Sequence, residues 1–331
     1  MQKKIGFDDF SGGIAASGGT LSNLNALIAA RHNAGLGSDP NSVLLVSEDA
    51  HSSFIKCIRI MGLDPTNLVR IKTDNQGRMD INNLIKNIDK CLIENKKIFA
   101  IVATLGTTVR GAIDPIKEIS EICKERNIWL HIDGSIGGIF AVTSIPIEGL
   151  NNINRANSIT INPQKIIGIT KTSSLLLVSN MNTLENTFST GLPYLSSKKN
   201  IINRGEIGIQ GSRPAEVIKL WLGLRFLGLK GIEEILESSI NRKEFFIKNI
   251  SKNKFDIFSG PLHIISFLPK GLTPKDTDFW TQTKGNELMK NNFMLSRPKF
   301  KDKYHLRVVM GNYNTKESHI EELLKLLDAY Q

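Results

Sequence analysis

The sequence has 331 residues, of which 40% are hydrophobic and 22% charged, a length and composition that suit one large α/β domain and a smaller second one. The formal net charge is +10, but the basic residues are scattered and form no long run with interleaved aromatic residues, so nucleic-acid binding is not expected. The three cysteines form no CxxC pair and no apolar run approaches roughly 18 residues, so we expect a cytoplasmic protein without disulfides, structural metal or membrane spans.

Segments typical of helices and of buried strands alternate from residue 20 to residue 179. Short apolar strands separated by helices are characteristic of βαβ units, which predicts an α/β fold with a mostly parallel sheet. The expected helices are 20–31, 51–61, 81–94 and 115–126, and the expected strands are 43–47, 68–71, 98–103, 128–132, 158–162 and 174–179.

The pattern changes after Gly191. Residues 191–211 have no periodicity and are expected to form a long loop, which in a compact protein is usually functional or disordered. We therefore expect a large domain at residues 1–230 and a small α+β domain at residues 231–331. The later elements are helical patterns over 214–229, 232–250, 278–290 and 316–329, and strands over 255–259, 263–268 and 305–310.

Two chemically active side chains each close a predicted strand. Asp133 ends one apolar run, and Lys165 follows another. In an open α/β sheet, ligands bind at the carboxyl ends of the strands. Pyridoxal phosphate (PLP) requires a lysine to hold its aldehyde and an acid to keep its ring nitrogen protonated. The pair therefore predicts a PLP site.

Other residues near the same edge of the sheet have both functional and structural interpretations. Gly18, Gly19 and Thr20 open the first helix, where backbone N–H groups suit a phosphate; a glycine-rich turn capped by Thr20 is the alternative. His51 could stack on a pyridine ring, although a lone loop histidine is more often structural or solvated. Threonines at 104–108 end another strand, where β propensity alone also favours them.

Taken together, the motifs resemble one family. They occur in the family's order: SGGTxSN from Ser17, ATxGTTxxGAxDPI from Ala103, WxHxDxxxGG from Trp129, NPxK from Asn162 and GSR from Gly211. From Ser17 to its C-terminus the chain is similar to the group II PLP-dependent amino-acid decarboxylases, such as those acting on glutamate, aromatic amino acids, histidine and diaminobutyrate. This resemblance implies fold type I, with a mostly parallel central sheet flanked by helices and a small C-terminal α+β domain.

The resemblance also implies a role for each motif residue. Lys165 would form the Schiff base with PLP, and Asp133 would pair with its ring nitrogen. His51 would stack on the ring, with Thr108 and Ser135 beside it. The remaining cofactor contacts would come from Gly19, Thr20 and Asn162 around the phosphate, and from Gln164, which can donate to phosphate or substrate.

Three further residues concern the substrate and the partner subunit. Arg307 resembles the arginine that binds the substrate carboxylate, although a surface arginine alternating along a strand is the structural alternative. Tyr194 resembles a loop tyrosine that protonates the carbanion after CO2 leaves. Ser212 resembles a residue that begins a helix and reaches the phosphate of the neighbouring subunit, so the family implies a homodimer with interfacial sites.

The chain also departs from the family pattern. Gln164 replaces the usual histidine, Gly134-Ser135-Ile136 replaces Ala-Ala-Tyr, and the family's N-terminal segment is expected to be missing. Decarboxylation of an L-amino acid to its amine is the leading expectation. An aldehyde-forming lyase, transamination, oxidative deamination or a non-catalytic PLP-binding homologue are alternatives, and the substrate stays open.

Overall fold

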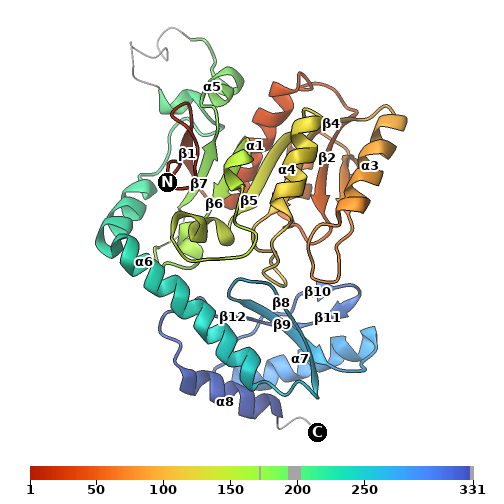
Figure 1. Cartoon of the computed structure of the whole chain (residues 1–331), viewed down its shortest axis with the longest axis vertical. Helices are drawn as coiled ribbons and strands as arrows, with labels where there is room; N and C mark the ends of the chain where they lie inside the picture. Colours follow the sequence, from red (N-terminus) through yellow and green to blue (C-terminus); the bar gives the residue numbers. More distant parts are fainter. Residues whose placement is uncertain (171–172, 193–202, 329–331) are drawn as a thin grey trace.

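The computed structural model describes residues 1–170, 173–192 and 203–328. In this part of the chain, a seven-stranded sheet has the order β1-β7-β6-β5-β4-β2-β3 (Figure 1). Strands β2 to β6 pair in parallel, whereas β7 is antiparallel to both β6 and β1, so the prediction of a mostly parallel sheet is confirmed. The strands are β1 Gly12–Ala16, β2 Ser42–Ser47, β3 Leu68–Ile71, β4 Lys97–Thr104, β5 Trp129–Gly134, β6 Ser158–Ile161 and β7 Ser174–Val178.

Helices cover both faces of this sheet because its central strands are apolar on both sides. In β2, Leu45 lies in the core cluster that contains residues of α3 and α4, and its neighbour Leu44 lies in the cluster that contains residues of α1 and α2. These helices are α1 Gly19–Asn33, α2 Ser53–Ile60, α3 Ile81–Ile93 and α4 Ile116–Glu125, and a short helix, α5 Asn182–Phe188, follows β7.

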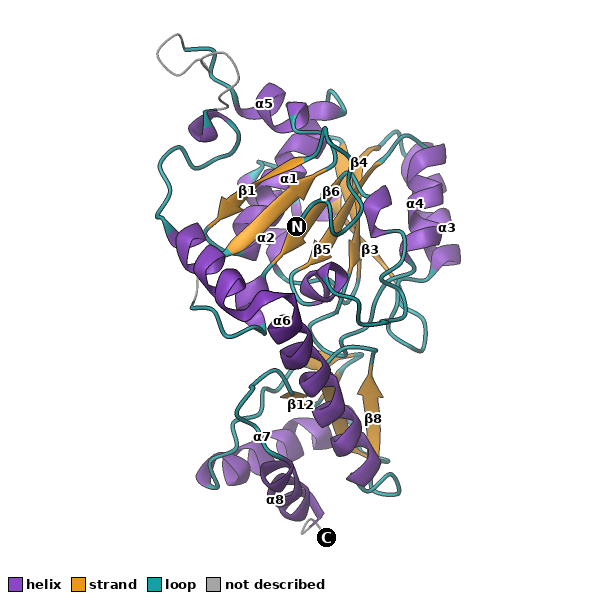
Figure 2. Cartoon of the chain, turned by 60° about the vertical axis from the view of Figure 1, so that its left-hand side comes forward, coloured by secondary structure: helices purple, strands orange, loops and turns teal. Residues whose placement is uncertain are grey.

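Helix α6 (Glu216–Asn249) leads from the large sheet to the C-terminal part of the chain (Figure 2). There, a three-stranded antiparallel sheet of order β12-β9-β8 packs with α7 and α8 around Phe246, Phe267 and Trp280. The predicted boundary at residues 230/231 falls within α6, so the division into domains stays a prediction. The elements are β8 Phe255–Ser259, β9 Ile264–Pro269, α7 Pro274–Lys290, β10 Lys299–Phe300, β11 Lys303–Tyr304, β12 Leu306–Val309 and α8 Glu317–Asp328.

The observed elements agree with the predicted ones to within a few residues, with a few differences that have local causes. Strand β1 was not predicted because Gly and Ala have low β propensity, and α5 was missed because it has only seven residues. The prediction that Ser212 begins a helix is wrong, since α6 starts at Glu216, after Pro214. Among the described residues, no helix has the length and hydrophobicity needed to cross a bilayer.

Candidate active site

Asp133 occupies the carboxyl end of β5 and is held there by two donors. Its side chain is 4% exposed. Nδ2 of Asn23, from α1, donates to Oδ2 at 3.2 Å, and the backbone N–H of Ser135 donates to Oδ1 at 3.1 Å. A buried carboxylate with two donors keeps a fixed orientation, which a group that must meet one atom of a ligand requires.

The start of α1 lies against the ends of β5 and β6. Gly18 is the N-cap residue with φ 115°, so the alternative that Thr20 caps the helix is wrong. A Cβ added to Gly19 would lie 2.5 Å from Nδ2 of Asn162 and 3.0 Å from Oγ of Ser135, so only glycine fits. Within the described residues, the N–H groups of Gly19 and Thr20 have no acceptor, and such a helix start suits a phosphate.

His51 lies between β2 and α2, close to the same edge. Its Nδ1 accepts a hydrogen bond from the backbone N–H of Ser53 at 3.1 Å, which leaves the proton of the neutral ring on Nε2. The pKa of His51 is lowered, mainly because the surrounding protein displaces water; the charge of Asp133 opposes this, and that of Lys165 adds to it. Both charged groups therefore act on His51, and the three share one site.

Lys165 ends the short helical turn Pro163–Lys165 that follows β6. It borders a cavity of about 630 Å³ between this turn, α6 and the loop after β12. Oε1 of the neighbouring Gln164 is enclosed there and has no donor among the described residues. Glu234 and Tyr313 face the same cavity from α6 and from the loop. An enclosed acceptor without a partner is available to a ligand N–H or O–H.

Arg307 connects the small sheet to the loop after β4. Its Nη1 donates to the carbonyl oxygen of Thr108 at 2.5 Å, and its Nε donates to Oγ of Ser296 at 2.7 Å. Burial lowers the pKa of the Arg307 guanidinium. Arg307 is half-buried on β12 and contacts Thr108, a residue expected near the cofactor ring, which favours the functional interpretation over that of a surface arginine.

One predicted residue is not brought to this site: Ser212 is exposed in the turn before α6. Tyr194 lies outside the described residues. Conversely, Asn23 and His131 belong to this buried cluster although the sequence assigned them no role. Both lie inside the quoted motifs, as the asparagine of SGGTxSN and the histidine of WxHxD, which was the available signal.

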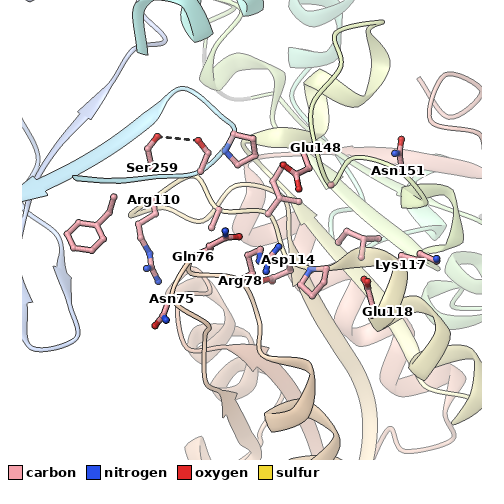
Figure 3. A pocket seen from close by; sticks show the side chains of 18 of the residues that line it. Asn75, Gln76, Arg78, Arg110, Asp114, Lys117, Glu118, Glu148, Asn151 and Ser259 are labelled. Carbon is pink, nitrogen blue, oxygen red and sulfur yellow. Dashed lines mark hydrogen bonds between the residues drawn. The ribbon is translucent and has the colours of Figure 1, made fainter. Parts of the chain in front are cut away.

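A second cavity, of about 580 Å³, is lined by other residues (Figure 3). It is bordered by loops of the large sheet, which carry Arg78 and Asp114, and by the turn between β8 and β9. Asp114 accepts from the backbone N–H groups of Met79 and Thr104 at 2.7 and 2.8 Å, and burial raises its pKa to about 7. Asp133, Lys165 and His51 do not line this cavity. Through its two hydrogen bonds, Asp114 connects loops at the wall of the cavity.

Comparison with known proteins agrees with this geometry. The family model described as "Pyridoxal-dependent decarboxylase conserved domain" matches residues 2–267. The chain is 30% identical over 338 residues to an aromatic-L-amino-acid decarboxylase of Bacillus atrophaeus, covering 99% of this chain and 70% of the relative. It is 32% identical over 253 residues to the acidic amino acid decarboxylase GADL1 of Xenopus tropicalis, covering 72% of this chain and 49% of the relative.

Solved structures show the same fold. Mouse CSAD in its apo form superposes with a TM-score of 0.88 at 24% identity, and Oryza sativa TDC with PLP and tryptamine with a TM-score of 0.90 at 20% identity. In each case, the match covers 99% of this chain and 73% of the solved one. The chain has the type I fold and belongs to the pyridoxal-dependent decarboxylase family, the PLP-dependent carboxy-lyases that act on amino acids.

Proposed function

We propose that this protein decarboxylates an L-amino acid to the corresponding amine, with Asp133 and Lys165 at the centre of the site. The proposal is carried by one observation: a buried carboxylate at the end of β5, a lysine just after the neighbouring strand β6 and the start of α1 lie at one edge of the sheet. When bound, PLP supplies an aldehyde for amines and a ring that accepts the electron pair left by departing CO2.

The residues present suit this cofactor. Asp133 would accept a hydrogen bond from the protonated ring nitrogen, because its carboxylate is buried and already fixed by Asn23 and Ser135. The phosphate would lie at the start of α1, with backbone donors from Gly19 and Thr20 and the amide of Asn162 alongside. His51 would stack on one ring face, with Thr108 and Ser135 near the ring.

The remaining proposed roles concern the substrate. Lys165 would hold the cofactor covalently and release it to the substrate amine. Arg307 would bind the substrate carboxylate, since its guanidinium has five N–H donors and its hydrogen bonds to Ser296 and Thr108 use only two of them within the described residues. Gln164 would donate to substrate or phosphate. Tyr194 would protonate the carbon that has lost CO2, as its family counterpart does.

We also propose a homodimer, with Ser212 reaching the partner's phosphate. The first half of α6 supports this, because it follows Ser212 directly and carries an apolar surface that one chain leaves uncovered. This surface consists of Val217, Ile218, Trp221, Leu222 and Phe226, which are between 46% and 89% exposed. A cytoplasmic location is proposed as well, since Cys57, Cys91 and Cys123 are unpaired and buried.

The dimer is tested by the mass of the protein in solution. The variant Phe226→Glu places a charge on the apolar surface of α6 and is expected to yield monomers in size-exclusion chromatography with light scattering. Phe279→Glu changes an equally bulky, 73% exposed side chain on α7 and should leave the dimer intact. A monomeric wild-type protein would contradict the proposal.

The reaction is tested by its products. With PLP supplied, the protein is screened against the twenty amino acids and diaminobutyrate, and CO2 and amine are measured together. Lys165→Ala is expected to abolish both amine formation and the visible absorbance of bound cofactor, while Lys117→Ala, exposed on α4, should retain both. An aldehyde or keto acid as the main product would instead support one of the other fold-type-I reactions. Failure to bind PLP at all would support a non-catalytic homologue.

A further inference from the structure

A hydrogen-bond network of four buried polar side chains lies behind Asp133. From the carboxylate outward, Nδ2 of Asn23 donates to Asp133 at 3.2 Å, and Oδ1 of Asn23 lies 3.1 Å from Nε2 of His131. Nδ1 of His131 lies 2.8 Å from Oγ of Ser158, which in turn accepts from Nε1 of Trp129 at 2.8 Å. These side chains come from α1, β5 and β6, and all four are buried.

Donor and acceptor chemistry fixes the direction of every hydrogen bond in this network. The indole N–H of Trp129 can only donate. At the other end, the carboxylate of Asp133 accepts, so Asn23 must turn its NH2 group to Asp133 and its oxygen to His131. Nε2 of His131 must then carry the proton.

The second nitrogen of His131 follows from the first. Burial lowers the pKa of His131 to about 4, so the imidazole is neutral near neutral pH and has a single N–H. Because that N–H is on Nε2, Nδ1 accepts, and the hydroxyl of Ser158 donates to it. Every bond from Trp129 to Asp133 therefore donates toward the carboxylate.

We propose that this directed hydrogen-bond network, and Asn23 and His131 in particular, is a positioning device that holds the Asp133 carboxylate aimed at the cofactor's ring nitrogen. The inference rests on the role proposed for Asp133. An aligned series of hydrogen bonds strengthens each of its members, so the carboxylate keeps a single orientation. His131 also prevents the Asn23 amide from rotating by 180°. That rotation would place Oδ1 of Asn23 against the Asp133 carboxylate, and the NH2 group of Asn23 against the N–H of His131.

The test replaces Asn23 with leucine and reads the cofactor directly. Ring-labelled ¹⁵N-PLP reports by NMR whether its nitrogen is protonated, and a dialysis series gives its dissociation constant. Asn23→Leu and His131→Phe are expected to weaken PLP binding about tenfold or more and to shift the ¹⁵N signal toward the unprotonated ring. Asn25→Leu is the matched control, because Asn25 is equally buried on α1 but bonds to Leu21 and Ile209, and both readouts should stay as in the wild type.

Two further measurements keep the outcomes separate. In ¹⁵N-histidine spectra of the unmodified holoenzyme, His131 should be neutral with its proton on Nε2; the Nδ1 tautomer or a charged ring would overturn the inference without any variant having to fold. Asp133→Asn should also give an unprotonated ring. If Asp133→Asn does so while Asn23→Leu and His131→Phe bind PLP within twofold of the wild type, the positioning role is refuted and the proposed role of Asp133 stands. If Asp133→Asn keeps the ring protonated, that role fails, and the positioning role with it.

Discussion

At the scale of single residues, the candidate site depends on a close approach between α1 and the ends of two strands. The backbone of Gly19 lies so close to the amide of Asn162 that a methyl group on Gly19 would not fit between them. Ser174 fixes that amide from the other side, with its Oγ 2.5 Å from Oδ1 of Asn162. Neither the backbone of Gly19 nor the amide of Asn162 can therefore move freely to make room for a side chain.

The first prediction follows from this contact. In Gly19→Ala, the added Cβ would lie 2.5 Å from Nδ2 of Asn162, so α1 must shift away from β6. We expect PLP affinity to fall about tenfold or more, as for the loss of roughly one charge-assisted hydrogen bond. Gly37→Ala, where an added Cβ meets nothing within 4 Å, should leave affinity unchanged when both are titrated with PLP. Equal affinities of the two variants would contradict the proposed phosphate site.

A second residue-scale prediction concerns pH. The folded pKa of Asp114, raised by burial to about 7, lies above its unfolded value of about 3.9. Between these values the folded protein binds the proton and the unfolded chain does not. The contribution of Asp114 to stability is therefore full below pH 4 and is lost as the pH rises to about 7, with a slope of up to about 1.4 kcal/mol per pH unit.

Urea denaturation at several pH values checks this sign. Asp114→Asn carries no titrating group and is expected to be less stable overall, because an amide cannot accept both the Met79 and the Thr104 N–H through equivalent oxygens. Its stability should, however, fall less steeply than that of the wild type between pH 4 and 7. Parallel pH profiles of the two proteins would show that Asp114 does not titrate between pH 4 and 7.

At the scale of elements, α6 changes character at Gly228. Before this residue the helix carries the exposed apolar surface that includes Trp221 and Phe226, and after it Ile232 and Leu236 are buried against the core. Gly228 adopts φ 63° and ψ 179°, a conformation that is accessible almost only to glycine. The break redirects the helix from the large sheet to the small one.

This predicts opposite effects for two glycines of the same helix. Gly228→Ala is expected to destabilise the protein by about 1–3 kcal/mol, because alanine does not tolerate this backbone conformation. Gly231→Ala is expected to stabilise it by about 0.5–1 kcal/mol, since an added Cβ makes an ordinary 3.5 Å contact with Leu227. Thermal unfolding of both variants measures the difference, and equal effects would contradict the break in α6.

At the scale of the whole molecule, Arg110 connects a loop of the large sheet to the C-terminal part of the chain. Its Nη2 lies 2.7 Å from Oδ2 of Asp49 in a buried ion pair, and its guanidinium lies 3.9 Å from the ring centroid of Phe300, in β10. Burial raises the pKa of Asp49 even though Arg110 opposes this. The backbone oxygen of Arg110 also accepts from Gly260 at 2.6 Å. One residue thus joins the loops of the large sheet to β10 and to the turn between β8 and β9.

Breaking this pair should therefore loosen the whole molecule. Arg110→Met leaves the Asp49 carboxylate buried without its cation, and a loss of about 3–5 kcal/mol in unfolding free energy is expected. Adding Asp49→Leu should restore part of this loss. Arg126→Met, which removes exposed ion pairs with Asp89 at 3.7 Å and Glu125 at 4.0 Å, should change stability by less than about 1 kcal/mol. A loss of stability no larger in Arg110→Met than in Arg126→Met would exclude a connecting role for Arg110.

The alternation of strands and helices, the mostly parallel sheet and the family were all predicted from the sequence. These depend on local patterns, because a buried strand and an amphipathic helix each show their own periodicity. The sequence also placed Asp133 and Lys165 at strand ends, since those ends are visible as the limits of apolar runs. The antiparallel direction of β7 was not readable, because the direction of a strand relative to its neighbours leaves no local pattern.

Which residues lie next to one another depends on the tertiary structure. β5 lies between β4 and β6 with Asp133 opposite Thr104 and Thr160, a register that the sequence of one strand does not contain. Asn23 reaches Asp133 across 110 positions of the chain, and Arg307 reaches Thr108 across 199. Such contacts follow from the order of strands in the sheet and the packing of α1 on it. For this reason the sequence predicted Asp133 and Lys165 as site residues, but not the buried hydrogen-bond network that holds Asp133 in place.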